Sequence, residues 1–278
     1  MSGESEPDFG FETEASLIYT ETPQPVLVKG KFGDFCFYTN GSPDRGRSNE
    51  DFFLLHTTDP SADCGAVGDG AGFYGNGGEM ATILATELQA GFKSGDLSEV
   101  ESNAHTRMSQ AITRNNEMDG GASYVAWKIT GNKLRFRSAG DVRLIVLDEN
   151  GQVVGSTKDQ HQPPPSDNVV WNCVSATKKP KPERLKEFKV ELQPGYRSII
   201  ASDRGWKDVS KSSSHDARRL RLEQSIRSSN EAVAGLVRGK STEDATQAIL
   251  TALEQVPVGS EGTDDTTLCV YDFTSTPD

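Results

Sequence analysis

The sequence lacks any apolar run approaching about 18 residues, the length that a membrane-spanning helix needs. Its N-terminus, which begins MSGESEPDFGFETE, is acidic and has no hydrophobic region of the kind found in a secretory signal. Basic residues are also scarce, since 29 Lys and Arg stand against 41 Asp and Glu for a formal net charge of −12. This balance argues against nucleic acid as the main partner, because phosphate binding needs clustered Lys and Arg. We expect a cytoplasmic protein with neither membrane nor nucleic acid as a partner, and a monomer as the default state.

Cysteine and histidine are few, with four of each. The spacings of Cys36, Cys64, Cys173 and Cys269 match no zinc motif. Three of these cysteines lie in apolar, strand-like stretches, where a free cysteine behaves as a small buried hydrophobic residue. We therefore expect four reduced, structural thiols, and zinc is disfavoured.

The length of 278 residues is enough to bury a substantial core, and 34% of the residues are hydrophobic. Residues 1–30 have low hydrophobic content and several Glu and Pro, which predicts a loosely ordered N-terminal lead-in. Residues 31–278 are expected to form a single domain. In that domain, alternation of Val125, Trp127 and Ile129 before a Gly131-Asn132 turn predicts a β-hairpin.

Helices are indicated by apolar residues at helical spacing. One is expected around residues 80–88, a second near 98–118, and two late ones near 215–238 and 241–256. Ser241 followed three residues later by Asp244 is a capping signature for the last of these. Strands and helices come in runs and do not alternate strictly, which favours an α+β domain with helices packed outside antiparallel sheets.

Carboxylates recur at predicted strand ends beside glycine or polar turns. They are Glu50-Asp51, Asp69, Asp203 and Asp264-Asp265. Strand ends are stiff and the neighbouring loops are exposed, so a scaffold can aim ligands from them. Gly70 leaves a backbone carbonyl open to a cation, and oxygen-only ligands suit Mg²⁺ or Mn²⁺. Taken singly, each aspartate is as well explained by local hydrogen bonds in a turn.

The order of short motifs along residues 45–273 is more specific than any of them alone. They read SNED, GDGAG, GGAS, AGDVR, ASDRGW and TDDTTLCVYDF. In this order they resemble the metal-dependent protein phosphatase family, the PPM or type-2C Ser/Thr phosphatases. The resemblance implies one catalytic domain with a layered αββα sandwich, made of two mainly antiparallel sheets flanked by helices. It also implies phosphoprotein substrates and two Mg²⁺ or Mn²⁺ ions, with a third, weaker ion.

The same resemblance implies a role for each matching residue. Asp69 matches the aspartate that bridges the two ions, and the carbonyl of Gly70 matches the backbone ligand beside it. Asp203 and Asp264 match ligands of the second ion. Together Asp69, Asp203 and Asp264 are the expected catalytic residues, acting through the ions that they hold.

Three further positions complete the expected metal-binding set. Glu50 and Asp51 match the acidic pair that binds the ions directly or through water. Asp119 lies about where family members place a ligand of the third ion. These residues follow from the family pattern, since spacing alone does not show that distant positions meet.

The phosphate-binding arginine of the family is displaced here. The family places it five residues before the aspartate of the acidic pair, a position that is Gly46 in this chain. Arg45 and Arg47 flank it, and either guanidinium suits a bidentate grip on phosphate. Arg47 is slightly favoured, and an exposed loop arginine is the alternative for both.

Other positions also depart from the pattern. The SDG element reads Ser202-Asp203-Arg204, and Asp265 stands where asparagine is usual. The GDSR element of the family is GDVR in this chain. Its Asp141 and Arg143 are expected to be structural turn residues. Because of these departures a second interpretation stays open, namely a catalytically weak or inactive phosphatase-like regulatory or binding module.

Overall fold

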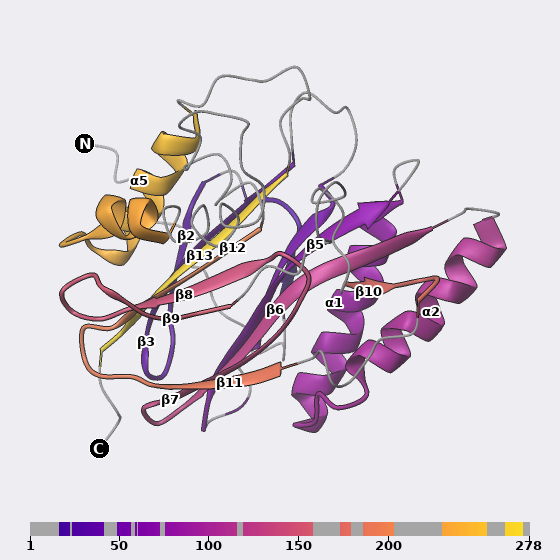
Figure 1. The fold of residues 1–278 in the computed structure, drawn as a ribbon, viewed down its shortest axis with the longest axis horizontal. Helices are drawn as coiled ribbons and strands as arrows, with labels where there is room; N and C mark the ends of the chain where they lie inside the picture. The colour runs from indigo at the N-terminus through magenta and orange to yellow at the C-terminus, as the bar shows by residue number, and fades with distance from the viewer. Residues whose placement is uncertain are drawn as a thin grey trace, which may run out of the picture.

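The computed structural model describes residues 17–22, 24–41, 49–56, 59, 61–72, 76–115, 119–157, 173–178, 186–202, 230–254 and 265–274. Within them, two antiparallel sheets pack face to face and helices lie on their outer faces (Figure 1). The expected αββα sandwich is confirmed. No described helix is both long and apolar enough to cross a membrane.

The strands of the first sheet all pair antiparallel. In spatial order they are β1 (Leu17–Tyr19), β4 (Asp51–His56), β5 (Asp63–Gly72), β6 (Gly120–Thr130), β7 (Lys133–Ala139) and β11 (Lys186–Glu191), with β10 (Val174–Ser175) also paired to β6. The hairpin expected around Gly131 is confirmed as β6–β7, and Gly131 has a φ of 58° in its turn. Its positive φ explains why glycine stands there.

The second sheet is built in the same way from strands far apart in the sequence. In spatial order they are β2 (Val26–Lys29), β3 (Gly33–Asn40), β13 (Thr266–Phe273), β12 (Arg197–Ala201), β8 (Arg143–Leu147) and β9 (Val153–Ser156). The lead-in expected over residues 1–30 therefore contributes two short edge strands, β1 and β2. They add to the sheets because Tyr19, Val26 and Val28 pack against the central core.

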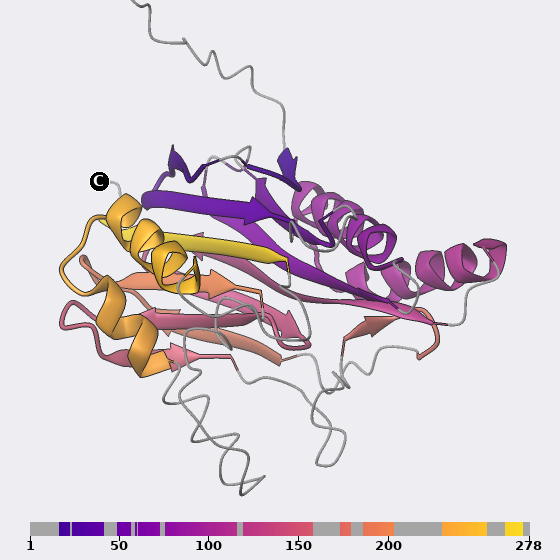
Figure 2. The same ribbon diagram turned by 90° about the horizontal axis from the view of Figure 1, so that it is seen from above.

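Helices cover the outer face of each sheet. α1 (Gly77–Ser94) and α2 (Val100–Asn115) pack on the first sheet, whereas α5 (Thr242–Glu254) and the helical segment 230–237 pack on the second. Figures 1 and 2 show α1 and α2 together on one side of the molecule and α5 on the other. The predicted helices near 80–88, 98–118 and 241–256 are confirmed, while residues 215–229 lie outside the described residues.

The core between the sheets is rich in aromatic residues, among them Phe35, Phe37, Phe53, Trp127 and Tyr271. Strand β4 is buried on both faces, because the second sheet covers one face and helices cover the other. Such double burial explains the continuous apolar run in its sequence. Several buried carboxylates, those of Glu50, Asp51, Asp141 and Asp265, lie at one end of the sandwich.

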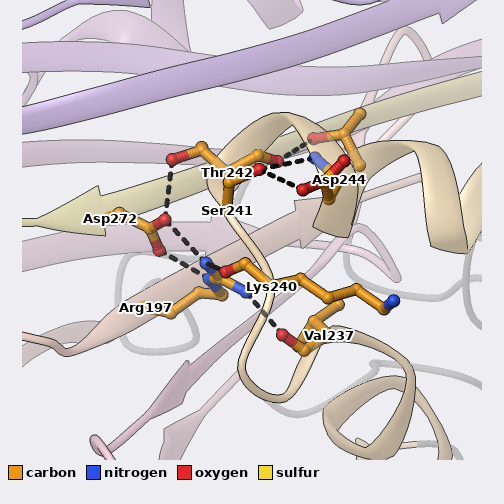
Figure 3. Close-up of polar contacts among 8 residues, drawn as sticks. Arg197, Val237, Lys240, Ser241, Thr242, Asp244 and Asp272 are labelled. Carbon is orange, nitrogen blue, oxygen red and sulfur yellow. Dashed lines mark hydrogen bonds and ion pairs between the residues drawn. The ribbon is translucent and has the colours of Figure 1, made fainter.

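Besides their apolar packing, the C-terminal helical segments are linked to the second sheet by the guanidinium group of Arg197 (Figure 3). Arg197 on β12 forms a bidentate ion pair with Asp272 on β13, at 2.5 and 2.6 Å. It also donates hydrogen bonds to the carbonyl oxygens of Val237 and Lys240, each at 2.7 Å. The expected cap of α5 is confirmed beside it, since the Asp244 N–H donates to Ser241 Oγ at 3.1 Å.

Candidate metal centre

The register of the first sheet brings Asp51 and Asp69 directly opposite each other. Asp51 on β4 pairs with Asp69 on β5, and Asp69 pairs in turn with Ser123 on β6. The Gly70 N–H donates to the Glu50 carbonyl at 2.9 Å, so positions 50 and 70 form a hydrogen-bonded pair. Because the two kinds of pair alternate in an antiparallel ladder, Asp51 and Asp69 form the non-hydrogen-bonded pair, in which side chains lie closest.

Both aspartates lie on the face of the first sheet that looks into the sandwich. Phe53 and Leu55 of β4 and Val67 of β5 belong to the core between the sheets. Side chains alternate along a strand, so Asp51 and Asp69 share that face and continue the core to its polar end. Asp51 is only 2% exposed, and Asp69 is partly exposed.

The second sheet brings another carboxylate to the same end. Asp265, which is 4% exposed, directly precedes β13, and its Oδ2 accepts a hydrogen bond from the Glu50 N–H at 2.6 Å. Ser202 follows β12 directly and exchanges hydrogen bonds with Thr267 of β13, at 2.9 and 3.0 Å. Thr39 of β3 shares a 2.6 Å hydrogen bond with the Thr267 hydroxyl. The ends of three strands are thereby fixed beside the Asp51–Asp69 pair.

Several expected site residues fall outside the described part of the chain. Asp203 follows Ser202 directly, and Asp264 precedes Asp265 directly, but neither is described. Arg45, Arg47 and Arg204 are likewise outside the described residues. Their roles stay predictions.

Glu50 and Gly70 meet at the start of α1. A Cβ built on Gly77 would lie 2.7 Å from Glu50 Oε1 and 2.6 Å from the Gly70 carbonyl oxygen. The Glu50 side chain, 5% exposed, therefore lies against the first turn of the helix. The structure thus brings together four of the expected residues, namely Glu50, Asp51, Asp69 and Gly70.

Asp119 lies further along the sheet. It directly precedes Gly120, which pairs with Gly72, three positions from Asp69 and hence about 10 Å along the strand. Its Oδ1 accepts hydrogen bonds from the Gly120 N–H at 2.8 Å and from Thr177 Oγ1 at 2.9 Å. The role expected for Asp119 as a ligand of a third ion stays a prediction.

Asp141 lies closer to the Asp51–Asp69 pair than the sequence indicates. Ser123, which pairs with Asp69, donates a hydrogen bond from its hydroxyl to Asp141 Oδ1 at 2.9 Å. Gly140 makes this approach possible, because at its φ of 92° a Cβ would overlap the Ser123 side chain. Arg143 instead donates to Asn230 Oδ1 at 3.2 Å and joins β8 to the 230–237 segment. Gly140 in the AGDVR segment was the available signal for this difference.

The chemistry of this end fits a divalent cation. Like charges directly opposite each other destabilise a sheet, and taking a carboxylate out of water costs free energy unless it is paired. Glu50, Asp51, Asp141 and Asp265 are each no more than 5% exposed. A cation would relieve both penalties, and an oxygen-only donor set suits Mg²⁺ or Mn²⁺. Within the described ranges alone, no three His, Cys, Asp or Glu side chains converge closely enough to hold an ion.

Cysteine does not supply alternative ligands here. All four cysteines are free thiols, as expected, and Cys36, Cys64 and Cys269 are buried. Burial raises the pKa of Cys64 to about 12 and that of Cys173 to about 11. Both values leave the side chain as the neutral thiol near neutral pH, the form that does not ligate a metal.

No protein-family model and no curated protein matches the sequence. Solved structures do match it. The catalytic domain of the serine threonine protein phosphatase PstP, in complex with 2 manganese ions, has 17% identity and a TM-score of 0.61, covering 91% of this chain and 100% of that one. PppA, described as a key regulatory component of T6SS in Pseudomonas aeruginosa, has 18% identity and a TM-score of 0.64, covering 89% and 100%. RsbX in complex with magnesium has 16% identity and a TM-score of 0.59, covering 90% and 100%. The likeness shows that this chain has the fold of these proteins.

Proposed function

We propose that this protein is a Mg²⁺- or Mn²⁺-dependent phosphatase of the PPM type that hydrolyses phosphoserine and phosphothreonine in proteins. The observation that carries the proposal is the Asp51–Asp69 pair, two carboxylates directly opposite each other at the polar end of the sandwich. The fold shared with the serine threonine protein phosphatase PstP, solved with manganese, and with RsbX, solved with magnesium, supports it. Bound divalent cations would supply hydroxide from water near neutral pH and would neutralise charge on the phosphoryl oxygens.

The residues of this chain would hold and orient the reacting groups. Asp69 would contribute to the binding of both ions, together with the Gly70 carbonyl and Asp51 for the first and with Asp203 and Asp264 for the second. Glu50 is better suited to fix the position of these groups, because its carboxylate lies against α1. The ligands sit on paired strands, so little side-chain motion would be needed during the reaction.

Phosphate would be oriented by arginine. Arg47 is the preferred residue and Arg45 the alternative, since each can donate two parallel hydrogen bonds to phosphate oxygens. They stand four and six residues before Asp51, on either side of the position that the family pattern gives to its arginine.

A third ion has two candidate ligands. Asp141 is joined through Ser123 to the strand position opposite Asp69. Asp119 is four residues before Ser123 and lies beyond the start of β6, so it is further from Asp69 along the sheet. We favour Asp141 over Asp119 for this reason.

The alternative is a phosphatase-like module that binds metal without turnover. Arg204 in place of glycine and the displaced arginine favour it. The retained carboxylates favour the enzyme. Both functions require metal binding, but only the enzyme hydrolyses phosphate esters. An assay of hydrolysis therefore distinguishes them.

We expect hydrolysis of an aryl phosphate and of a phosphothreonine peptide with Mn²⁺ or Mg²⁺, and none with chelator. Asp69→Asn and Asp264→Asn should each lower the rate by about 100-fold or more, because each removes a carboxylate from the expected metal set. Asp148→Asn is the matched control. Asp148 accepts hydrogen bonds from Asn150 and Gln152 in the β8–β9 turn, a role that asparagine can also fill.

Chelator-insensitive hydrolysis would contradict metal dependence. Metal binding by a well-folded protein without turnover would identify the regulatory alternative. Loss of rate in Asp148→Asn equal to that in Asp69→Asn would show that the effect is not specific to the carboxylate end.

A further inference from the structure

We propose that Gly77, in the first turn of α1, is a positioning residue for the metal centre. The absence of a Cβ at this position lets the helix begin in direct contact with the Glu50 carboxylate and the Gly70 carbonyl. The inference rests on the proposed function, in which the Gly70 carbonyl is a metal ligand and Glu50 fixes the position of the ligands. It adds that α1 determines where these two groups lie.

The contact between Gly70 and Gly77 is reciprocal. A Cβ on Gly77 would lie 2.6 Å from the Gly70 carbonyl oxygen and 2.7 Å from Glu50 Cδ and Oε1. A Cβ on Gly70 would overlap the Gly77 carbonyl and lie 2.9 Å from the Glu50 carbonyl oxygen. Real Cβ atoms essentially never approach other heavy atoms this closely, so the backbones of β5 and α1 meet here with no side chain between them.

Glu50 is held on its main-chain side by both sheets. Its carbonyl accepts the Gly70 N–H at 2.9 Å, and its N–H donates to Asp265 Oδ2 at 2.6 Å. The main chain at Glu50 therefore cannot move without disturbing both strand ends. An added methyl group at position 77 would therefore displace the Glu50 side chain and the Gly70 carbonyl.

The helix is held equally firmly. Met80 and Leu84 of α1 are fully buried in the outer core, and Asn76 before the helix donates to the Asp119 carbonyl at 3.1 Å. A retreat of α1 by the width of a methyl group would open this core. A substitution at Gly77 should therefore displace the Glu50 carboxylate and the Gly70 carbonyl, and α1 should keep its place.

Electrostatics also favours this arrangement. α1 has 18 residues, and the first backbone N–H groups of a helix carry partial positive charge with no partner inside the helix. The Glu50 carboxylate lies against this end. The helix therefore attracts and orients Glu50 from one side, while β4 fixes its backbone from the other.

The test measures Mn²⁺ affinity by calorimetry on the full chain, comparing wild type, Gly77→Ala and Gly235→Ala. Gly235 lies in the helical segment 230–237, where a Cβ would meet nothing within 4 Å. Alanine normally stabilises a helix relative to glycine, so Gly235→Ala should bind Mn²⁺ like wild type. Gly77→Ala should bind about tenfold more weakly or worse.

A double-mutant comparison tests the proposed contact itself. Glu50→Asp shortens the side chain by one methylene and makes room for a Cβ at position 77. Gly77→Ala should then weaken Mn²⁺ binding less in the Glu50→Asp background than in wild type. An equal loss in both backgrounds would overturn the role assigned to the Glu50 contact.

Hydrogen exchange on the wild-type protein gives a readout that does not depend on folding of the variant. Mn²⁺ should slow exchange at amides 77–80, and should leave those at 242–245 in the first turn of α5 unchanged. Equal exchange at 77–80 with and without Mn²⁺ would overturn the inference, as would wild-type affinity in Gly77→Ala. Absence of Mn²⁺ binding by the wild-type protein would instead contradict the proposed function.

Discussion

Asp63 carries a buried carboxylate at the end of β5 remote from Asp69. It is 7% exposed and accepts hydrogen bonds from the backbone N–H groups of Lys31 and Phe32, at 2.7 and 2.8 Å. Burial nevertheless raises the pKa of Asp63 above its ordinary value. The residue joins the turn before β3 to the first sheet, at the cost of keeping a carboxylate away from water.

This raised pKa has a definite consequence for stability. The folded state binds the proton more tightly than the unfolded state, so the unfolding free energy falls as pH rises from about 3.9 through the raised pKa. Each unit of increase in the pKa corresponds to about 1.4 kcal/mol. Asp63→Asn should remove this part of the pH dependence, measured by urea unfolding at a series of pH values. An unchanged slope would contradict the assignment, and Asp148→Asn, in an exposed turn, should keep it.

The state of single residues was predictable where the local sequence determines it, as for the cysteines. The thiols were expected to be reduced, and the structure has all four free. The closeness of Asp51 and Asp69 was not predictable from spacing, because it depends on the register between β4 and β5. The contact of Glu50 with α1 depends on two glycines that meet from different elements.

Between elements, Arg197 connects two strands to the ends of two helical segments (Figure 3). Its guanidinium contacts Asp272 and the carbonyls of Val237 and Lys240, and Thr242 at the start of α5 donates to Asp272 Oδ2 at 2.6 Å. The side chains of Arg197 and Asp272 are 11% and 23% exposed. Since β12 ends at Ala201 and β13 begins at Thr266, this link lies at the opposite end of both strands from the candidate metal centre.

Arg197→Lys should lower the unfolding free energy by about 2 kcal/mol, because lysine cannot reproduce the bidentate pair and both carbonyl contacts. Urea unfolding measures the loss. Arg135→Lys is the control, since Arg135 forms a 3.9 Å ion pair with Glu187 in which both side chains are more than half exposed. The control should change stability by less than about 0.5 kcal/mol. Equal stability of Arg197→Lys and wild type would show that the contacts at Arg197 contribute nothing.

Elements were predictable where the pattern is long. The alternation through Val125, Trp127 and Ile129 gave β6, and helical spacing with a capping residue gave α5. β1, β2 and β10 have two to four residues each, too few for a periodic pattern. They form because neighbouring strands and the central core accept them, which is tertiary information.

At the scale of the whole molecule, the acidic composition has a partial structural explanation. The formal net charge is −12, and Glu50, Asp51, Asp69, Asp141 and Asp265 gather at one end of the sandwich. Two divalent cations there would change the formal charge from −12 to −8. The remaining acidity is distributed over the rest of the chain.

The sandwich as a whole followed from the order of motifs, whereas its topology did not. Neighbouring strands such as β3 and β13 come from opposite ends of the described chain. Such pairs are determined by the packing of the two sheets, so no local sequence pattern predicts them. Asp265 reaches Glu50 only because of this closure.

The most direct test of a metal centre at this end is anomalous diffraction from crystals of the protein grown with Mn²⁺. We expect two manganese peaks beside the Asp51–Asp69 pair, at least one of them about 2.0–2.6 Å from an Asp69 carboxylate oxygen, the range of oxygen ligation for hard divalent ions. Crystals of Asp69→Asn should lose that peak. Ordered Asp51 and Asp69 side chains with no manganese between them, or manganese bound only elsewhere, would contradict the metal centre.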